Sequence, residues 1–221
     1  SSGFIGAPLC VDLARDHPVV GVDCRPPSSD QVRAAPGVRW VRADIAEEDP
    51  LRDLFRREAR RGAGLAAVIH LAAFYHFGRR WRPEYARVNL EGTRHVVQAA
   101  AAAGAERLVF AGSIAALAPD PGGRPLTEGA ATLEDVAYAR SKALGEALLA
   151  ECAGDLPWVT IRMGGVFTDW CELPPLFSLI RTWRRPGPLG RRLLGRGGAG
   201  FPYIRRGEVL AMIRRVVEGR H

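Results

Sequence analysis

Tyr138 and Lys142 are the two residues of this chain whose types and spacing most directly suggest chemistry. They lie four positions apart in a helical pattern over residues 133–152, so their side chains share one face of the expected helix. A phenol ordinarily has a pKa of about 10, and a fixed cation beside it favours the phenolate and lowers that pKa. The pair therefore predicts a proton donor and acceptor for an alcohol or a carbonyl group. The plainer interpretation is a pair of solvated helix residues.

The lysine is unusual for this chain. Lys142 is the only lysine among 31 lysine and arginine residues. A compact ammonium with three rotatable donors cannot be exchanged for a planar guanidinium without a change of geometry. Its presence at this position favours a specific role over the plainer interpretation.

Composition limits the class of protein. A length of 221 residues and a hydrophobic content of 47% fit one α/β domain with a real core, or a domain plus a fragment. The four cysteines show no metal-binding spacing, so we expect reduced thiols, a cytoplasmic location and no metal site. The lack of a long apolar run and of a signal peptide predicts no membrane partner. The net charge of +7 comes from arginines scattered among acids, which argues against a nucleic-acid partner.

The first residues have the spacing of a phosphate-binding turn. Gly3-Phe4-Ile5-Gly6 precedes a helical pattern, and a short apolar strand over residues 19–23 then ends at Asp23. Glycines let backbone N–H groups approach a pyrophosphate, a helix N-terminus favours its charge, and an acid about twenty residues on accepts hydrogen bonds from ribose hydroxyls. This is the second half of a dinucleotide-binding unit. The alternative for Asp23 is a loop acid that happens to follow a strand.

Strand and helix patterns alternate along the rest of the chain. Strand patterns cover residues 38–41, 66–73, 107–111 and 158–162, and helical patterns cover residues 47–61, 83–103 and 133–152. The alternation predicts an α/β fold with a Rossmann-like doubly wound parallel sheet. We expect a cofactor-binding domain over residues 1–165. Residues 166–221, with a strand at 201–205 and a helix at 207–218, are expected to begin a small C-terminal substrate-binding lobe.

In order and spacing, these motifs resemble the extended short-chain dehydrogenase/reductases, the NAD-dependent epimerase/dehydratase family. The resemblance rests on the segments at residues 2–6, 44–45, 70–73, 89–93, 162–167 and 202–204, together with Asp23 and with Ser113, which lies 25 positions before Tyr138. It implies a catalytic set of Ser113, Tyr138 and Lys142. It implies cofactor contacts from Gly3, Phe4, Ile5, Gly6, Asp23, Asp44, Ile45, Leu71, Ala72, Ala73, Asn89, Tyr138 and Lys142.

The resemblance also implies a cofactor and a reaction. A carboxylate at Asp23 accepts hydrogen bonds from a free ribose diol and repels a 2′-phosphate, which predicts NAD rather than NADP, although Arg25 could hold a phosphate. We expect hydride transfer at a secondary alcohol or ketone of a small-molecule substrate, with Tyr138 as acid and base. Epimerase, keto-reductase and hydroxy-dehydrogenase activities stay open, as do a cofactor-binding regulator without catalysis and an inactive truncated fragment. A homodimer is the assembly that we consider.

Some positions depart from the family pattern. The first strand and the first glycine are absent, and because that strand is central in a doubly wound sheet, its two neighbours would each lose a partner. We therefore expect the chain to be a fragment. Met163 and Thr168-Asp169 also differ from the family pattern. Phe201 stands where nucleotide-sugar enzymes commonly carry an arginine, which argues against a UDP-sugar substrate.

Two further sets of residues admit more than one interpretation. Phe74, Tyr75, Phe77 and Trp81 either line a substrate pocket or pack inward as part of a loop. His70 suggests a metal ligand, but its place at the end of an apolar strand favours a core residue with a hydrogen-bonding partner.

Overall fold

The chain alternates helices with parallel strands, as the sequence predicts. The structure is a computed structural model and describes residues 1–61, 64–76, 78–133, 135–171, 173–187 and 200–219. Its strands are β1 (Val19–Asp23), β2 (Val38–Arg42), β3 (Val68–His70), β4 (Leu108–Ser113), β5 (Trp158–Met163), β6 (Gly165–Phe167) and β7 (Tyr203–Arg205). Its α-helices are α1 (Gly6–Leu13), α2 (Ser29–Ala34), α3 (Glu48–Arg61), α4 (Gly92–Ala102), α5 (Ala137–Cys152), α6 (Pro174–Trp183) and α7 (Arg206–Val217). A π-helix, η1 (Tyr85–Glu91), precedes α4, and a 3₁₀ helix, η2 (Ile114–Ala116), follows β4.

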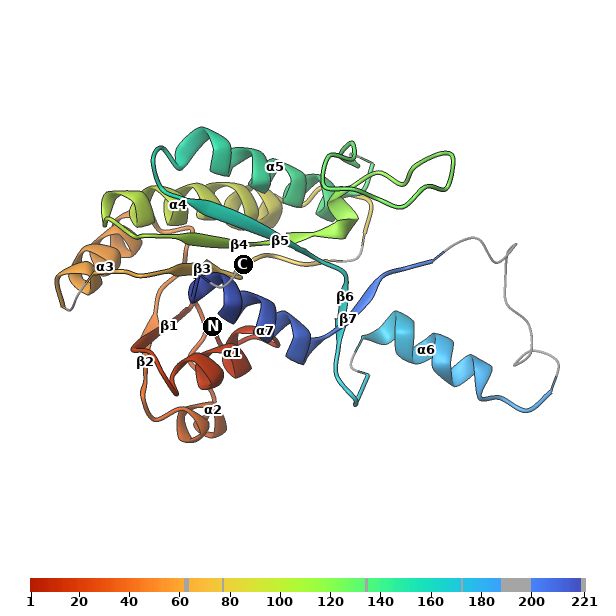
Figure 1. Cartoon of the computed structure of the whole chain (residues 1–221), viewed down its shortest axis with the longest axis horizontal. Coiled ribbons are helices and arrows are strands. Elements are labelled where there is room, and N and C mark those ends of the chain that lie inside the picture. Colours follow the sequence, from red (N-terminus) through yellow and green to blue (C-terminus); the bar gives the residue numbers. More distant parts are fainter. Residues whose placement is uncertain (62–63, 77, 134, 172, 188–199, 220–221) are drawn as a thin grey trace.

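The strands are parallel, and the sheet is divided in its middle (Figure 1). β1 pairs with β2, while β3, β4 and β5 form a second group in that order, and β6 pairs with β7. Among the described residues no strand joins β1 to β3, where a doubly wound sheet has its first strand. The prediction that two neighbouring strands each lack a partner is therefore confirmed. β3 is shorter than the predicted strand at 66–73, and it hydrogen-bonds on one side only, to β4.

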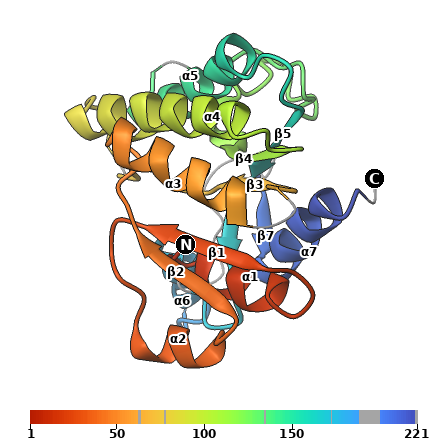
Figure 2. The ribbon, with the colours of Figure 1, turned by 90° about the vertical axis from the view of Figure 1, so that its left-hand side faces the viewer.

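Helices cover both faces of the β3–β5 group. α4 and α5 lie on one face with α3 beside α4, and α7 lies on the other face next to α1 (Figure 1, Figure 2). α6 lies beyond β6 and β7, apart from these layers (Figure 1). The predicted doubly wound α/β arrangement is confirmed. No helix in the described ranges is long and apolar enough to cross a membrane.

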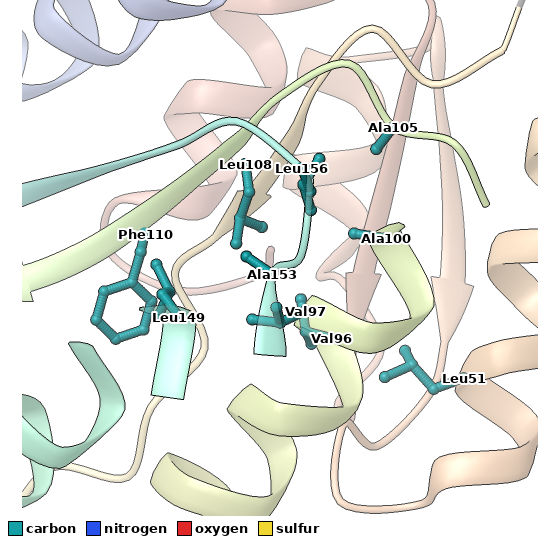
Figure 3. Close-up of a cluster of buried hydrophobic side chains, with 10 residues drawn as sticks. All are labelled: Leu51, Val96, Val97, Ala100, Ala105, Leu108, Phe110, Leu149, Ala153 and Leu156. Carbon is teal, nitrogen blue, oxygen red and sulfur yellow. The ribbon is translucent and has the colours of Figure 1, made fainter. Parts of the chain in front are cut away.

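One buried apolar cluster lies between β4 and the helices α3, α4 and α5 (Figure 3). Its members are Leu51, Val96, Val97, Ala100, Ala105, Leu108, Phe110, Leu149, Ala153 and Leu156. α5 approaches β4 closely at Gly145, where an added Cβ would lie only 3.1 Å from the Phe110 ring. Because each large apolar side chain stabilises the fold by about 1.5–3 kcal/mol when buried, this cluster fixes α5 over β4.

A second apolar cluster links the β1–β2 pair to the β3–β5 group. Leu9 and Leu13 of α1 pack against Val209 and Ile213 of α7, and apolar residues of β1 and β3 border the same cluster. α7 belongs to the predicted C-terminal region, so that region shares a core with residues 1–165. The domain boundary at residue 165 stays a prediction.

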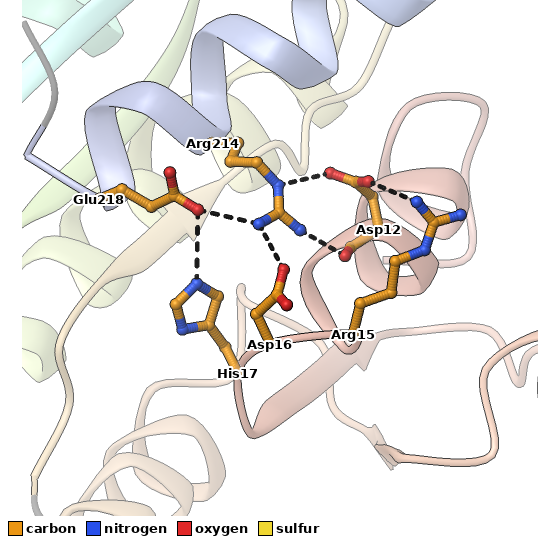
Figure 4. Close-up of polar contacts among 6 residues, drawn as sticks. All are labelled: Asp12, Arg15, Asp16, His17, Arg214 and Glu218. Atoms are coloured by element: carbon orange, nitrogen blue, oxygen red, sulfur yellow. Dashed lines mark hydrogen bonds and ion pairs between the residues drawn. The ribbon is translucent and has the colours of Figure 1, made fainter.

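A polar cluster around Arg214 also ties α7 to α1 (Figure 4). Arg214 Nε donates to Asp12 Oδ2 at 2.9 Å, and its Nη1 donates to Asp16 Oδ2 at 2.7 Å and to Glu218 Oε1 at 2.8 Å. His17 lies 3.8 Å from the same oxygen of Glu218. The hydrogen bonds to Asp12, Asp16 and Glu218 raise the pKa of Arg214 well above its usual range. The two helices are therefore joined by charge as well as by apolar contact.

Local differences from the predicted elements have physical causes. The helix predicted over residues 83–103 is divided into η1 and α4. α5 begins at residue 137 rather than 133, because Leu133 N–H donates to the Ala116 carbonyl at 2.8 Å and pairs the two ends of the preceding loop. α2 was not predicted. Ser28 and Gln31 form a capping box at its start, which stabilises a helix too short to show a clear periodicity.

Candidate active site

Lys142 lies in the interior of the protein, between α5 and β4. It is 5% exposed. Its Nζ donates a 2.6 Å hydrogen bond to the Ala111 carbonyl oxygen of β4 and lies 4.9 Å from the centre of the Phe110 ring. The plainer interpretation of Lys142 as a solvated helix residue is therefore wrong.

Burial sets the charge balance around this lysine. It lowers the pKa of Lys142 from 10.5 to about 8, while the Glu146 carboxylate acts in the opposite direction. Burial also lowers the pKa of His70 to about 3, and the Lys142 charge adds to that shift. His70 is therefore neutral at ordinary pH, and its Nε2 lies 3.0 Å from the Thr93 hydroxyl. The interpretation of His70 as a core residue with a hydrogen-bonding partner is confirmed.

Ser113 and Tyr138 meet at the carboxyl end of β4. Ser113 is the last residue of that strand, and its side chain lies beside the Tyr138 phenol. Burial raises the pKa of Tyr138, and the Ser113 hydroxyl offsets this only in part. The direction is opposite to the lowering expected from Lys142, whose ammonium is directed at the Ala111 carbonyl. In this arrangement the phenol carries its proton at neutral pH.

The predicted glycine turn opens α1. Gly3 and Ile5 lie in the turn, and Ile5 packs into the cluster that α1 shares with α7. A Cβ on Gly6 would lie 2.7 Å from the Ser1 carbonyl oxygen, so the turn requires a glycine at this position. Phe4 is 40% exposed. The chain therefore forms a tight turn at a helix N-terminus, as the sequence predicts.

Asp23 ends β1 beside this turn. Its Oδ2 accepts hydrogen bonds of 2.8 Å from the Ser1 amino group and the Ser2 N–H, and its Oδ1 accepts one of 3.0 Å from the Arg25 N–H. Burial raises the pKa of Asp23, and the hydrogen bonds from the backbone N–H groups of Arg25 and Ser2 lower it. The carboxylate is therefore charged at neutral pH and lies where an acid for ribose hydroxyls is expected.

Asp44 and Ile45 follow the carboxyl end of β2. Asp44 accepts hydrogen bonds from the Ala46 N–H at 3.0 Å and from Arg87 at 2.6 Å. The Ala46 bond, opposed by burial and supported by Arg87, keeps the pKa of Asp44 below its usual value. Ile45 lies close to the first residue of α4, because a Cβ on Gly92 would lie 2.7 Å from its Cδ1. The Arg87 contact was not apparent from the sequence.

Asn89 holds the chain that leaves β3. Residues 71–73 follow β3, and residues 72 and 73 are exposed. The next residue is bound by both ends of the Asn89 amide: Phe74 N–H donates to Oδ1 at 2.6 Å, and Nδ2 donates to the Phe74 carbonyl at 3.0 Å. Nδ2 also donates to Ser141 Oγ at 2.9 Å. Asn89 lies in the π-helix η1, a type of turn that often occurs at functional sites. It supports the predicted cofactor segment rather than presenting a free amide.

Aromatic side chains border the Tyr138 phenol. The Tyr75 ring meets the Tyr138 ring edge-on, with 4.8 Å between the ring centres. Tyr75 and Trp81 are 51% and 39% exposed, so both keep accessible ring surface, whereas Phe74 is half-buried. Phe77 lies outside the described residues. The pocket-lining interpretation therefore fits Tyr75, and the packing interpretation fits Phe74.

Three supporting residues were missed by the sequence reasoning. Ser141 Oγ donates to the Tyr138 carbonyl at 2.8 Å, and Arg162 lies 2.8 Å from Glu146 in an ion pair. Glu146 follows Lys142 by four positions, so helical spacing could have identified it. No sequence signal indicates that Arg162, on β5, faces this acid.

A hollow of about 540 Å³ lies away from these groups. It is lined by residues 118–121, 124–127 and 130–131 of the loop between β4 and α5. Neither Ser113, Tyr138 nor Lys142 lines it. The candidate site is therefore assigned from the chemistry of Ser113, Tyr138 and Lys142 rather than from the position of the hollow.

Comparison with known proteins bears on this geometry. The sequence profile described as "NAD dependent epimerase/dehydratase family" matches residues 1–170. A 3 beta-hydroxysteroid dehydrogenase/Delta 5-->4-isomerase of monkeypox virus is 31% identical over 143 residues, covering 62% of this chain and 38% of that protein. Human 3 beta-hydroxysteroid dehydrogenase type 7 is 34% identical over 123 residues, covering 48% of this chain and 32% of that protein. The chain thus spans a minor part of the length of these relatives.

Solved structures share the fold over almost the whole chain. UDP-glucose 4-epimerase of Thermus thermophilus, in complex with NAD, has a TM-score of 0.72 and 25% identity, with 98% of this chain and 72% of that chain covered. MoeE5 in complex with UDP-glucose and NAD has a TM-score of 0.72 and 25% identity, with 99% and 70% covered. The Bordetella bronchiseptica enzyme WbmG in complex with NAD and UDP has a TM-score of 0.75 at 20% identity, with 98% and 66% covered.

Proposed function

Because the chain belongs to the NAD-dependent epimerase/dehydratase family, we propose that it is an NAD-dependent oxidoreductase or epimerase acting at a secondary alcohol or ketone carbon. One observation carries the proposal: the Ser113 side chain lies beside the Tyr138 phenol at the carboxyl end of β4. Lys142 lies on the next turn of the same helix and bonds the carbonyl two residues before Ser113. Ligands of open α/β sheets bind at this end of the strands.

The described residues fit NAD. The glycine turn opens α1, whose N-terminus has no side-chain cap and would hold a pyrophosphate, and Asp23 places a charged carboxylate next to it. Asp44 and Ile45 follow the neighbouring strand, and residues 71–73 leave β3 on the same side. We propose that these groups hold the cofactor, as the NAD complexes of similar folds support. When bound, NAD supplies the acceptor and donor for the hydride at the substrate carbon.

The side chains supply the proton and hold the reacting oxygen. Tyr138 accepts the hydroxyl proton when an alcohol is oxidised and returns it when a ketone is reduced. Ser113 donates a hydrogen bond to the reacting oxygen and stabilises the charge that develops there. Lys142, whose ammonium bonds the Ala111 carbonyl on the strand that ends at Ser113, would hold the ribose hydroxyls beside the nicotinamide when NAD is bound. Because burial raises the pKa of Tyr138, ketone reduction should proceed at neutral pH, and alcohol oxidation should accelerate as the pH rises.

A cofactor-binding regulator on the same fold is the competing function. Such a protein needs neither the phenol nor a buried ammonium. Lys142 is held in the interior although burial disfavours its charge, which is a cost to stability without benefit in a regulator. This favours catalysis. The four cysteines are free thiols, which fits the expected cytoplasmic location. The homodimer stays a prediction that analytical ultracentrifugation would check.

The test is turnover of Tyr138→Phe with NAD and a panel of substrates: simple secondary alcohols, a 3β-hydroxysteroid and UDP-glucose. NADH formation reports oxidation, and product analysis reports epimerisation. The variant should lose activity on the order of 10²-fold or more, because its ring cannot transfer a proton, and should keep its affinity for NADH. Glu151→Gln, at an exposed position of the same helix, is the control and should keep full turnover. A Tyr138→Phe protein with wild-type turnover contradicts the assignment. NADH binding without turnover of any substrate by wild type supports the regulator.

A further inference from the structure

Glu146 lies one helical turn beyond Lys142 on α5 and is held there by an arginine of β5. Its side chain is 12% exposed. Arg162 Nε donates to Glu146 Oε1 at 3.2 Å and to Oε2 at 2.9 Å, and Arg162 Nη2 lies 2.8 Å from Oε2. Arg162 Nη1 also donates to the Glu128 carbonyl at 2.8 Å. The carboxylate therefore has a fixed position and a charged partner.

Strand β4 has a gap that this carboxylate fills. A Cβ added to Gly112 would lie 2.6 Å from Glu146 Oε1 and 2.5 Å from Thr160 Cγ2. The preceding residue of the strand, Ala111, accepts the hydrogen bond from Lys142. The acid and the ammonium thus lie against consecutive residues of the same strand, and only a glycine at 112 leaves room for the acid.

Few charged or titratable groups face Lys142. Among the described residues, α5 contributes Glu146, with Tyr138 one turn before Lys142 on the same helix; β3 contributes His70, and β5 contributes Arg162, whose charge is paired with Glu146. β4 contributes only the Ala111 carbonyl and the Phe110 ring. His70 is neutral in its buried position, and Tyr138 carries its proton. Glu146 is therefore the negative charge in this set.

We propose that Glu146 is a positioning residue, whose carboxylate is fixed by Arg162 against Gly112 and keeps the buried Lys142 ammonium charged and directed along β4. Arg162 holds the acid in its ionised form at the correct distance. The catalytic meaning of this arrangement rests on the proposed function, but the effect on the charge of Lys142 does not. Nothing in it requires cofactor or substrate.

The single lysine of the chain makes a direct test feasible. Protein labelled with lysine carrying ¹³C at Cε and ¹⁵N at Nζ gives one lysine side-chain signal, and its titration reports the pKa of Lys142 in the folded protein. Wild type is expected to titrate at about 8. Glu146→Gln keeps the size and the hydrogen-bonding oxygen but removes the charge, so the midpoint should fall by about one unit. Glu151→Gln removes an exposed acid from the same helix and should leave the midpoint unchanged.

Glu146→Asp is the second variant. It keeps the negative charge but withdraws it by one methylene, so its midpoint should lie between those of wild type and Glu146→Gln. If Glu146→Gln does not fold, Glu146→Asp alone tests the proposal, because the titration midpoint of Lys142 in that variant should lie below the wild-type midpoint. A midpoint unchanged in the folded variants overturns the proposal. A shift of equal size in Glu151→Gln also overturns it, because the effect would then be one of net charge.

Activity separates this inference from the proposed function. If Lys142 must be charged for turnover, the activity of Glu146→Gln relative to wild type should decline as the pH rises from 6 to 8, and Glu146→Asp should restore part of it. A shifted NMR midpoint with an unchanged pH profile supports the role of Glu146 and counts against the role of Lys142 in turnover. An unchanged midpoint overturns the inference whatever the activity of the protein.

Discussion

Replacing Lys142 with methionine should stabilise the protein and abolish a rise in its stability at alkaline pH. Methionine is unbranched and of similar length, so it fills the space between α5 and β4 without a charge. Burial lowers the pKa of Lys142 from 10.5 to about 8. Each pKa unit corresponds to about 1.4 kcal/mol, so the buried ammonium costs on the order of 3 kcal/mol at pH 7. That is a considerable part of the roughly 5–15 kcal/mol by which domains are stable.

The sign follows from proton binding. Below about pH 8 the folded and unfolded states both hold the Lys142 proton, and the cost is constant. Between pH 8 and 10.5 the folded protein loses that proton before the unfolded chain does. The unfolded state then binds more protons, so the stability of wild type rises with pH across this window. The raised pKa values of Cys10 and Tyr138 act in the opposite sense at alkaline pH, because their unfolded forms ionise first.

The assay is urea unfolding of both proteins from pH 7 to 10. Subtracting the two curves removes the contributions of the thiols and phenols, which the variant leaves in place. The difference in the free energy of unfolding between Lys142→Met and wild type should be greatest at pH 7 and should decrease steadily above pH 8. Arg140→Met, which removes an exposed cation from the same helix, should show no such pH-dependent difference. A constant difference between wild type and Lys142→Met would show that the folded-state pKa of Lys142 is ordinary and would refute the reasoning.

Two further predictions concern the cofactor and the helix pair. Wild type should bind NADH more tightly than NADPH, and Asp23→Ala should weaken the binding of NADH about tenfold, because a charged hydrogen-bond acceptor is lost. Fluorescence titration measures both affinities. Tighter binding of NADPH than of NADH by wild type contradicts the role of Asp23. Arg214→Ala should lower the free energy of unfolding by about 2 kcal/mol, because it leaves several acids without their cation. The exposed neighbour Arg215→Ala should change it by less than about 0.5 kcal/mol, and equal losses in denaturant unfolding would show that the cluster adds nothing.

The strand and helix order could be predicted because each element has its own local signal. β1 and β4 are mostly apolar runs, β2 and β5 are rich in β-branched and aromatic residues, and α3 has charged ends and an apolar face. The division of the sheet could also be predicted, since the family topology places a strand between β1 and β3. The family spacing predicted that Ser113 and Tyr138 lie together, and in the structure the two side chains are neighbours.

The rest depended on contacts between distant segments. The π-helix η1 contains Asn89, whose amide binds Phe74 and Ser141, and neither contact has a signature in the local sequence. The direction of the Tyr138 pKa was also missed. Spacing alone places a cation on the same helix face, but whether it reaches the phenol depends on other acceptors nearby. Here the Ala111 carbonyl takes the ammonium, and burial then dominates the pKa of the phenol.

Burial acts on Tyr138 and Lys142 in a way that gives their neighbours a clear effect. It favours the neutral form of each, raising the pKa of Tyr138 and lowering that of Lys142, so both shifts oppose the charged pair that proton transfer requires. Each group has one neighbour that acts against burial: Ser113 lowers the pKa of the phenol, and Glu146 raises that of the lysine. Ser113 comes from the end of β4, and Glu146 is fixed by Arg162 of β5. The protonation of the site is therefore controlled by the strands beneath α5 as well as by the helix that carries both groups.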